Sequence, residues 1–528
     1  MQPNRRDLAR APLGAAAVLA AAGDAAVPAG DAEEVELGPG WHPVDKDRVV
    51  RGTLTLRPGA RLRISRGTIL TLLGDLVAPA ATIFVGEGRV DLTGSRVVAA
   101  RPEWWGAVPG DPGQDCAFPI EAALAAHPAV QLGPGDYYLG RTLEVKHANR
   151  RLWGIGRTNG AHGTRLLRRG GDGAVVRVGT EASPATINAY LRGIDLRWIE
   201  LGRTEAPAAG AIGLAVRHVL DSVFEGLRAN EHAVGFSLRG AVRTLVNDCA
   251  AFCSVFPGQA DDAFIGFDLD GTSPPISTGA NASLFLTDCS ARTGNRAGLA
   301  GAVGCQLLGA FSDTVLTRFE TTELGYGILI DGGAGAPHGR YAQLDLRLDG
   351  CVLDRCGRAG IVIRRLGATA MVEIAAPWLA VTAGAEAALH LRDTGGAITV
   401  TGGQLVATGG GASTGMLMER TAGVSLTGTK LLDTTRPVMA QWSSGFDLAV
   451  AVLAGAAPVG VAVALSNCMG GTVRARVLAP GGQVATGVAL DTACRSVTVE
   501  TAGLTGAAVP VRVGDVPVHG AGGVVAIA

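Results

Sequence analysis

The chain contains 528 residues, which is enough to form a large hydrophobic core. It carries 46 basic and 47 acidic residues and a net charge of −1, so no basic excess favours nucleic acid or an anionic membrane surface as a partner. The 9 cysteines have no regular spacing and include no Cys-x-x-Cys pair. This predicts small buried side chains rather than a disulfide framework or a metal site.

Residues 1–33 allow two interpretations. Arg5 and Arg6, the short apolar stretch from Ala11 to Gly23 and the small residues from Ala26 to Ala29 resemble a twin-arginine export signal. The same pattern fits a short anchoring helix in a protein that is not exported by that route. The sequence leaves both interpretations open.

Residues 34–100 are predicted to form a small β domain. Segments such as Thr53 to Leu56 and Leu62 to Ile64 alternate with a period of two, and Gly and Pro separate them. We expect this domain to cap or adapt the start of the structure that follows, because an uncovered strand edge recruits other strands.

One short helix is predicted after this domain, from Phe118 to Ala126. Ile120, Ala123 and Leu124 give it an apolar side. A helix of about nine residues is not stable alone in water. It is therefore expected to pack as a cap on the β structure that follows.

Four short motifs follow one another between residues 101 and 156. They are Trp105-Gly106-Ala107, the helical segment Ile120 to Leu124, the turn Pro134-Gly135-Asp136-Tyr137 and the strand Gly154-Ile155-Gly156. In this order they resemble the start of right-handed parallel β-helix proteins, a superfamily that includes pectate lyase-like enzymes, rhamnogalacturonase-type hydrolases and phage tailspikes. The loop from Gly110 to Asp115 departs from that pattern because it lacks the paired acids of the family.

The resemblance implies an all-β fold: a right-handed parallel β-helix, or solenoid, over residues 101–440, with its capping helix at 118–126. Trp104 and Trp105 would plug the core at its start. The layout resembles phage tailspikes and the head spikes of gene-transfer agents most closely. It therefore also implies a homotrimer whose N-terminal region binds a virion adaptor or capsid base.

A Gly-φ-x-φ phrase, in which φ is apolar, recurs after residue 140 and predicts repeated strands. It begins at Gly235, Gly327, Gly360, Gly415, Gly460 and Gly487. Cys249, Cys289 and Cys351 each follow an Asp by one or two residues, and their separations are close to two and three coils of about 20 residues. At about 23 residues a coil, residues 140–510 would form roughly 16 coils.

Residues 441–528 are predicted to be an apolar β region that takes part in oligomerisation. The uncharged run from Leu448 to Leu465 is long enough to span a membrane. Gly455, Pro458 and Gly460 interrupt it, which favours strands and turns over a spanning helix. Such a weakly charged surface needs a cover, and sister chains of a trimer would supply one.

Acids, arginines and tyrosines gather between residues 260 and 350, and this density predicts the functional site. Glycoside hydrolysis needs two carboxyl groups about 5–9.5 Å apart, and acids on neighbouring coils about 4.8 Å apart meet that distance easily. The catalytic candidates are Asp313, Glu320, Glu323 and Asp331. The substrate-binding candidates are Asp268, Asp270, Arg318, Tyr326, Arg340, Tyr341 and Arg347. Such residues on a solenoid also serve simply to keep a β surface soluble, and that alternative applies to all of them.

Two functions remain open from the sequence. The first is a trimeric spike on a phage or gene-transfer particle that recognises capsule or another surface polysaccharide, with or without depolymerase activity. The second is an exported polysaccharide lyase or glycoside hydrolase, located in the periplasm or outside the cell. No cofactor or metal is predicted, except that a lyase could use Ca²⁺ to neutralise a uronate carboxylate.

Overall fold

The computed structural model describes residues 34–156, 163–254, 264–272, 281–294, 299–333, 344–408, 413–455, 457–479, 484–518 and 523–528. The predicted export signal or anchor at 1–33 lies outside the described residues, as do Arg340 and Tyr341. Contacts divide the chain into two compact units. The first contains the residues up to Val108 together with Phe118–Gln131, and the second contains Pro109–Ala117 and the residues from Leu132 onward.

Residues 34–91 of the first unit form three sheets of three parallel strands each, so the predicted β domain is itself a short parallel β-helix. The first sheet contains β1 (Glu34–Leu37), β4 (Thr53–Leu56) and β7 (Leu76–Val77); the second contains β2 (Gly40–Val44), β5 (Ala60–Ile64) and β8 (Phe84–Gly86); the third contains β3 (Arg48–Val50), β6 (Ile69–Leu72) and β9 (Arg89–Asp91). Leu54, Leu62 and Leu70 point into its core and are fully buried.

The predicted short helix is present as α1 (Ala117–Ala126) and is followed by β10 (Ala129–Gln131). Its apolar side is buried as expected, with Ile120, Ala123 and Leu124 at most 2% exposed. The 3-10 helix η1 (Pro102–Trp105) places Trp104 in the core and leaves Trp105 half-buried. Their ring centroids lie 6.5 and 4.9 Å from that of Phe84.

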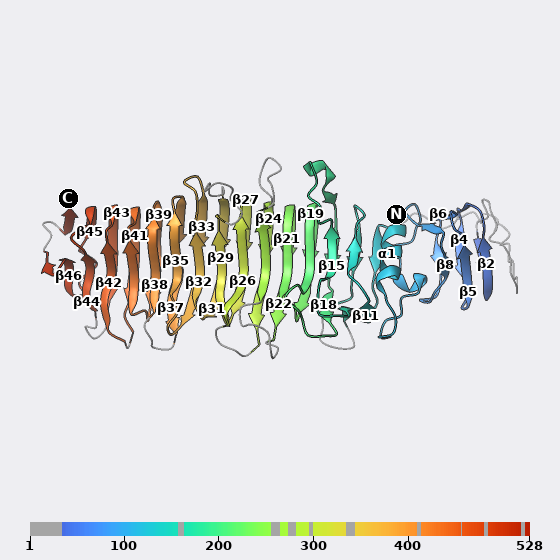
Figure 1. Ribbon diagram of the computed structural model, residues 1–528, viewed down its shortest axis with the longest axis horizontal. Coiled ribbons are helices and arrows are strands. Elements are labelled where there is room, and N and C mark those ends of the chain that lie inside the picture. Colours follow the sequence, from blue (N-terminus) through green and yellow to red (C-terminus); the bar gives the residue numbers. More distant parts are fainter. Residues whose placement is uncertain are drawn as a thin grey trace, which may run out of the picture. The chain divides into compact units, whose positions relative to one another are not determined.

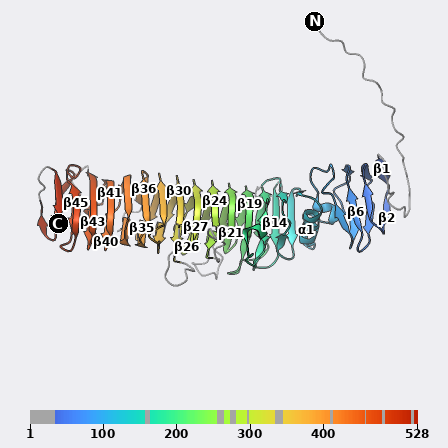
Figure 2. The same ribbon diagram turned by 90° about the horizontal axis from the view of Figure 1, so that it is seen from above.

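The second unit is a parallel β-helix, which confirms the predicted fold class. Its strands belong to one sheet of 39 strands and follow one another along the axis of the unit (Figures 1 and 2). Each coil presents up to three strands to solvent, which we call faces A, B and C in chain order. Five long strands bend from one face to the next.

Face A contains β11 (Gly135–Leu139), β14 (Thr164–Arg168), β18 (Glu200–Arg203), β20 (Arg228–Asn230), β22 (Ala250–Cys253), β25 (Ser290–Thr293), β28 (Glu320–Thr322), β31 (Val352–Cys356), β34 (Trp378–Thr382) and β37 (Gln404–Thr408). Face B contains β12 (Leu143–Val145), β15 (Ala174–Gly179), β23 (Ile265–Gly271), β26 (Leu299–Gly309), β29 (Leu324–Asp331), β32 (Ala359–Arg364), β35 (Ala387–Thr394), β38 (Thr414–Thr421), β40 (Arg436–Gln441), β42 (Val459–Ser466), β44 (Val484–Leu490) and β46 (Ala507–Val513).

Face C contains β13 (Arg151–Trp153), β16 (Leu191–Arg192), β17 (Asp195–Arg197), β24 (Asn281–Thr287), β27 (Phe311–Thr317), β30 (Leu344–Asp349), β33 (Met371–Ala375), β36 (Ala397–Thr401) and β45 (Arg495–Glu500). The long strands β19 (Ile212–Glu225) and β21 (Val234–Asn247) join faces B and C, and β39 (Val424–Leu432), β41 (Ser444–Leu453) and β43 (Met469–Leu478) join faces C and A.

The length of a coil is not constant at the predicted value of about 23 residues. Leu214 pairs with Phe236 one coil later, 22 residues on, whereas Phe267 pairs with Cys305, 38 residues on. The apolar strand positions stay in register because the extra residues lie outside the strands. Sequence distance is therefore a poor guide to which side chains stack.

The Asp-Cys phrase marks one corner of the coil, between faces C and A. Asp248, Asp288 and Arg318 occupy this corner in successive coils with φ of 50–52°. Each donates its backbone N–H to a carbonyl of the next coil, at 2.8–3.1 Å. Cys249 and Cys289 follow the corner residue and point into the core, where each is 1% exposed. All nine cysteines are buried and free, in line with the predicted core role.

The predicted C-terminal β region consists of further coils. The apolar run from Leu448 to Leu465 lies in β41 and β42, as strands rather than a helix. Within the described residues, no helix is long and apolar enough to cross a membrane. The chain ends in β47 (Val516–Pro517) and β48 (Val524–Ile527), which pair antiparallel with β46 and β45 and so cover part of the last edge.

Candidate functional site

The residues predicted from sequence to form the site lie on all three faces. Face B carries Asp268, Asp270, Tyr326 and Asp331, and face C carries Asp313 and Arg347. Arg318 is at the corner between faces C and A. Glu320 is on face A in β28, and Glu323 directly follows that strand. Their clustering in sequence therefore does not produce one cluster in space. Their roles remain predictions.

Asp331 has a clear structural function. Its side chain is 2% exposed, and Arg364 Nε and Arg365 Nε donate to it at 2.9 and 2.8 Å. Arg365 Nη2 and the backbone N–H of Gly333 also contact this carboxylate. Burial alone would raise the pKa of Asp331, but the hydrogen bond from Arg365 and the charges of both arginines outweigh it and lower the pKa.

The other candidates of this region make local contacts. Glu323 forms an ion pair with Arg355 at 2.7 Å, and the Tyr326 hydroxyl accepts a hydrogen bond from Arg358 at 2.9 Å. Arg318 forms two hydrogen bonds of 2.6 Å to Asp288, the residue below it in the corner column. Arg347 lies 3.7 Å from Asp349. Asp313 and Glu320 are exposed.

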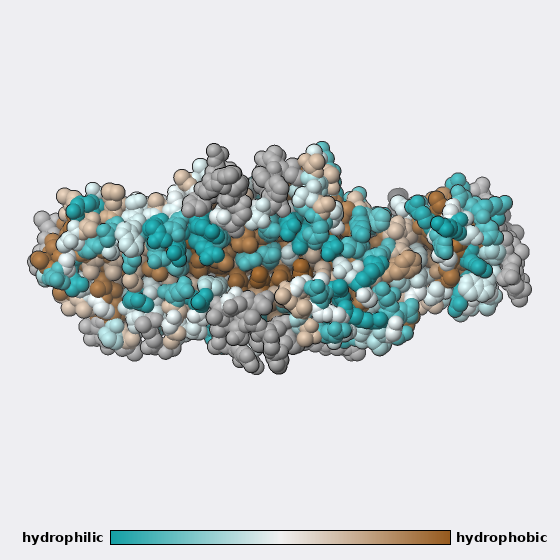
Figure 3. Space-filling view, in the orientation of Figure 1, coloured by the Kyte–Doolittle hydropathy of each residue, from teal (hydrophilic) through white to brown (hydrophobic). Residues whose placement is uncertain are grey.

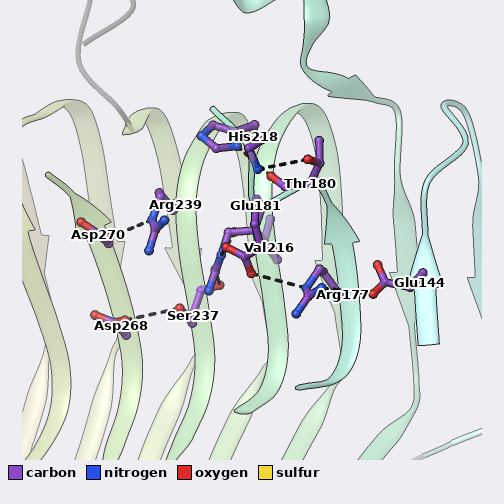
Figure 4. Close-up of polar contacts among 12 residues, drawn as sticks. Glu144, Arg177, Thr180, Glu181, Val216, His218, Ser237, Arg239, Asp268 and Asp270 are labelled. Atoms are coloured by element: carbon purple, nitrogen blue, oxygen red, sulfur yellow. Dashed lines mark hydrogen bonds and ion pairs between the residues drawn. The ribbon is translucent and has the colours of Figure 1, made fainter. Parts of the chain in front are cut away.

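Asp268 and Asp270 belong to a charged ladder on face B (Figure 4). Asp268 accepts from Gln306 Nε2 at 2.7 Å and from Ser237 Oγ at 3.3 Å, and burial raises its pKa. Asp270 accepts from Arg239 Nε at 2.9 Å; hydrogen bonds from Thr272 and the charge of Arg239 overcome the effect of burial and lower its pKa.

The ladder continues over the preceding coils of face B. Arg177 lies 3.2 Å from Glu144 and 3.4 Å from Glu181, and Glu181 also pairs with Arg217 at 3.0 Å. The Arg217 side chain is only 5% exposed and donates to the Ser237 carbonyl at 2.8 Å. The charges alternate in sign from Glu144 to Arg217. Arg217 and Arg239 are register partners of the same sign, and each pairs with a different acid.

The middle of face B is apolar. Figure 3 shows apolar side chains gathered along it, over the strands from β19 to β32, with hydrophilic side chains on both sides. Ile212, Val234 and Ile265 form one half-buried row in register. The neighbouring row changes along the axis from Ser237, Asp268 and Gln306 to Leu329 and Val362. The polar groups of this row already bond one another, which leaves little hydrogen-bonding capacity for a sugar.

Face A carries a pocket of about 480 Å³ that sequence reasoning missed. The lining comes from five successive coils, β14 to β25. It consists of Arg165, Leu167, Glu200, Gly202, Arg203, Arg228, Asn230, Glu231, Phe252 and Arg292. Arg165, Glu200 and Arg228 occupy one outward row, and Asn230, Phe252 and Arg292 occupy the next.

Two glutamates reach this face A pocket. Glu200 is 6% exposed, and its Oε1 accepts from Asn230 Nδ2 at 2.8 Å. Glu231 stands at the end of β20 with φ of 63°, and both of its carboxylate oxygens accept hydrogen bonds from Ser254, at 2.9 and 3.0 Å. Burial raises the pKa of Glu231 despite these bonds. The pocket is therefore lined by a buried carboxyl group, Glu200, and by a half-buried one, Glu231, whose pKa is raised.

Arginines give the same pocket an excess of positive charge. Arg165 is held by Asp136 through two bonds of 2.6 Å. Arg203 donates to His232 Nδ1 at 2.9 Å and to several backbone carbonyls; burial and the charge of Arg168 lower its pKa to about 10. Arg292 lies over the Phe252 ring, 5.7 Å from its centroid.

The sequence holds a weak signal for this pocket. The alternation in Arg228-Ala229-Asn230 marks two outward side chains on one strand, with Ala229 in the core. Nothing in the sequence tells which outward residues of other coils lie beside them, because the coil lengths vary. Among the described residues, no group of three or more His, Cys, Asp and Glu side chains could hold a metal ion.

Comparison with known proteins shows similarity at the level of fold. No family model and no curated protein matches the chain. The N-terminal fragment of gene product 12 of bacteriophage phi29 is 13% identical with a TM-score of 0.50, over 79% of this chain and 73% of that one. The tailspike protein of E. coli bacteriophage HK620 is 11% identical over 77% and 76% of the two chains, with a TM-score of 0.49.

A β-helix enzyme module is also similar in fold. The A-module of the Azotobacter vinelandii mannuronan C-5 epimerase AlgE6 is 12% identical, over 75% of this chain and 98% of that one, with a TM-score of 0.41. At these identities the comparisons establish the parallel β-helix and nothing further about activity.

Proposed function

We propose that the protein is a polysaccharide-binding spike of a phage or gene-transfer particle, which recognises capsule or another surface polysaccharide. The face A pocket is the observation that carries this proposal. It offers charged and amide groups beside an aromatic ring, Phe252, on coils that hold their shape through continuous strand pairing. Polar groups with an aromatic side chain suit a sugar, and a rigid site loses little entropy on binding.

A trimer would multiply the effect of one shallow pocket. Three linked sites acting on a repeating polymer gain roughly 10² to 10⁴ in overall affinity over a single site. Exposed apolar side chains in the C-terminal region support a contact between sister chains there: Trp442 is 55% exposed, Met469 61% and Val516 64%. The N-terminal region would attach to the adaptor or capsid, and the protein would then lie on the virion surface.

The alternative is an exported polysaccharide lyase or glycoside hydrolase, located in the periplasm or outside the cell. It is favoured by Glu200 and Glu231, which line one pocket, since hydrolysis needs a pair of carboxyl groups with one that retains its proton. A lyase would use a basic side chain of the pocket, with arginine or Ca²⁺ on a uronate carboxylate. The hydrogen bonds that occupy both oxygens of Glu231 favour binding over catalysis.

One incubation distinguishes the two functions. The full-length protein is mixed with capsular and other surface polysaccharides extracted from bacteria, and bound polymer, new reducing ends and absorbance from 4,5-unsaturated ends are followed together. We expect bound polymer without new ends. New reducing ends would establish an enzyme, and the absorbance would separate a lyase from a hydrolase. If no polysaccharide is bound or cleaved, the proposed function is wrong.

Replacing Phe252 by alanine is expected to weaken polysaccharide binding about fivefold, because stacking on an aromatic ring contributes about 1 kcal/mol. Phe285 on β24 is the matched control: it is 40% exposed on face C, away from the pocket. Phe285→Ala should bind as the wild type does. Equal loss in the two variants, or none in either, would place the ligand elsewhere.

A further inference from the structure

The charge of the face A pocket indicates the class of sugar that it takes, if the pocket binds polysaccharide as proposed above. Four arginines and two glutamates line it. Arg165 is neutralised by Asp136, and Arg203 is directed to backbone carbonyls and His232. Arg228 and Arg292 remain, and neither forms an ion pair within 4 Å among the described residues. Two cations are thus available to a ligand.

Three buried polar atoms in the pocket have no partner among the described residues. They are Arg228 Nε, Glu200 Oε2 and Asn230 Oδ1. Each buried polar group left without a hydrogen bond costs about 1–3 kcal/mol. The set comprises one donor and two acceptors, so a ligand that satisfies it must bring an acceptor for the arginine and hydroxyl donors for the other two.

The positions of these atoms on the strands set the spacing of the ligand groups. Glu200 and Arg228 are register partners on β18 and β20, which are separated by about 4.8 Å. Asn230 is the next outward residue after Arg228 and already binds the other oxygen of Glu200. Donor and acceptors therefore lie within the width of a single sugar ring.

We propose that the face A pocket binds an acidic sugar residue of the polymer through its carboxylate. The carboxylate accepts from Arg228 and Arg292, and neighbouring ring hydroxyls donate to Glu200 and Asn230. An arginine fork matches a planar carboxylate with two parallel hydrogen bonds. Glu200 repels a second anion at this position, so the pocket selects a sugar that carries both one carboxylate and free hydroxyls.

The test uses the polysaccharide that binds in the incubation described above, in its native form and after carbodiimide and borohydride treatment has reduced its carboxylates to alcohols. Wild-type protein is expected to bind the reduced polymer at least tenfold more weakly. Arg228→Ala and Arg292→Ala should each bind the native polymer at least tenfold more weakly than the wild type does. Each variant should bind the reduced polymer as weakly as the wild type does. Arg228→Lys should recover part of the loss, because it restores the charge without the fork.

Arg243→Ala is the matched control, since Arg243 is exposed and paired with Asp221 outside the pocket. It should bind both polymers as the wild type does. Equal wild-type binding to the two polymers would overturn the inference while leaving the polysaccharide function intact. The same holds if Arg228→Ala weakens both polymers equally, or if the bound polymer carries only sulfate or phosphate groups. Unfolding midpoints for all variants show whether any loss reflects misfolding instead.

Discussion

Replacing Gly235 by alanine is expected to lower the free energy of unfolding by about 3 kcal/mol, the upper part of the usual range for overpacking. Gly235 begins one of the Gly-φ-x-φ phrases, and the next coil passes directly over it. A Cβ atom there would lie 2.6 Å from the carbonyl oxygen of Gly266 and 2.6 Å from Ala251 Cβ. Backbone and Cβ atoms cannot rotate away, so relief requires the coils to separate.

Gly460→Ala is the matched control for this prediction. Gly460 begins the same sequence phrase, but a Cβ atom there meets nothing within 4 Å. Its φ is not in the left-handed region, so alanine fits the folded backbone. Alanine should therefore leave the free energy of unfolding unchanged, or raise it by up to about 1 kcal/mol because it lowers the conformational entropy of the unfolded chain. Denaturant unfolding followed by circular dichroism measures both variants. Gly235, Gly266, Gly304 and Gly327 form a glycine column, in which a Cβ atom on one of the first three would meet the carbonyl oxygen of the next. Similar stability in the two variants would show that this column does not limit the spacing of the coils.

Asp331→Asn is expected to destabilise the protein by about 2 kcal/mol at neutral pH, because it removes the charged acceptor of Arg364 and Arg365. The two arginine side chains are 43% and 42% exposed, so water partly solvates them after the loss. This moderates the cost below that of a fully buried pair. Polysaccharide binding should not change, because Asp331 contacts its own arginines on face B.

The stabilisation by Asp331 should depend on pH in a defined direction. Its pKa in the folded protein is lower than in the unfolded chain, where it is about 3.9. Stabilisation is therefore complete well above pH 4 and is lost as the pH falls through the folded-state pKa. The gap in stability between wild type and Asp331→Asn should close on acidification.

Asp313→Asn provides the comparison, because Asp313 is an exposed acid that the sequence also marked as catalytic. Asn tolerates its φ of 49°, so stability should change little. If Asp331→Asn instead keeps full stability and abolishes cleavage of a polysaccharide, Asp331 is catalytic and its structural role is minor.

The fold could be predicted because its signals are local. Ile120, Ala123 and Leu124 mark the apolar side of α1 wherever the helix packs. Cys249 and Cys289 mark core positions because the side chain that follows a corner residue points into the core. Such features depend on the period of the strand or helix, which neighbouring residues determine.

The face A pocket could not be predicted, because it depends on stacking between coils, and none of the described candidate residues lines it. The density of acids and arginines between residues 260 and 350 is real, yet Asp331 lies on face B, Glu320 on face A and Asp313 on face C. The Gly-φ-x-φ phrases at Gly460 and Gly487 look alike in sequence but do not align in space. Val488, the residue after Gly487, is in register with Val463 and not with Val461, so Gly460 does not stack on Gly487.

By itself, the sequence determined the all-β class, the capping helix and the apolar strand positions, since each follows from alternation and turn residues over a few positions. Only the tertiary structure decided that Arg165, Glu200 and Arg228 lie side by side. Strand pairing aligns their coils, while loops of different length set their distances in sequence. The face A pocket exists because hydrogen bonding between coils fixes the register independently of loop length.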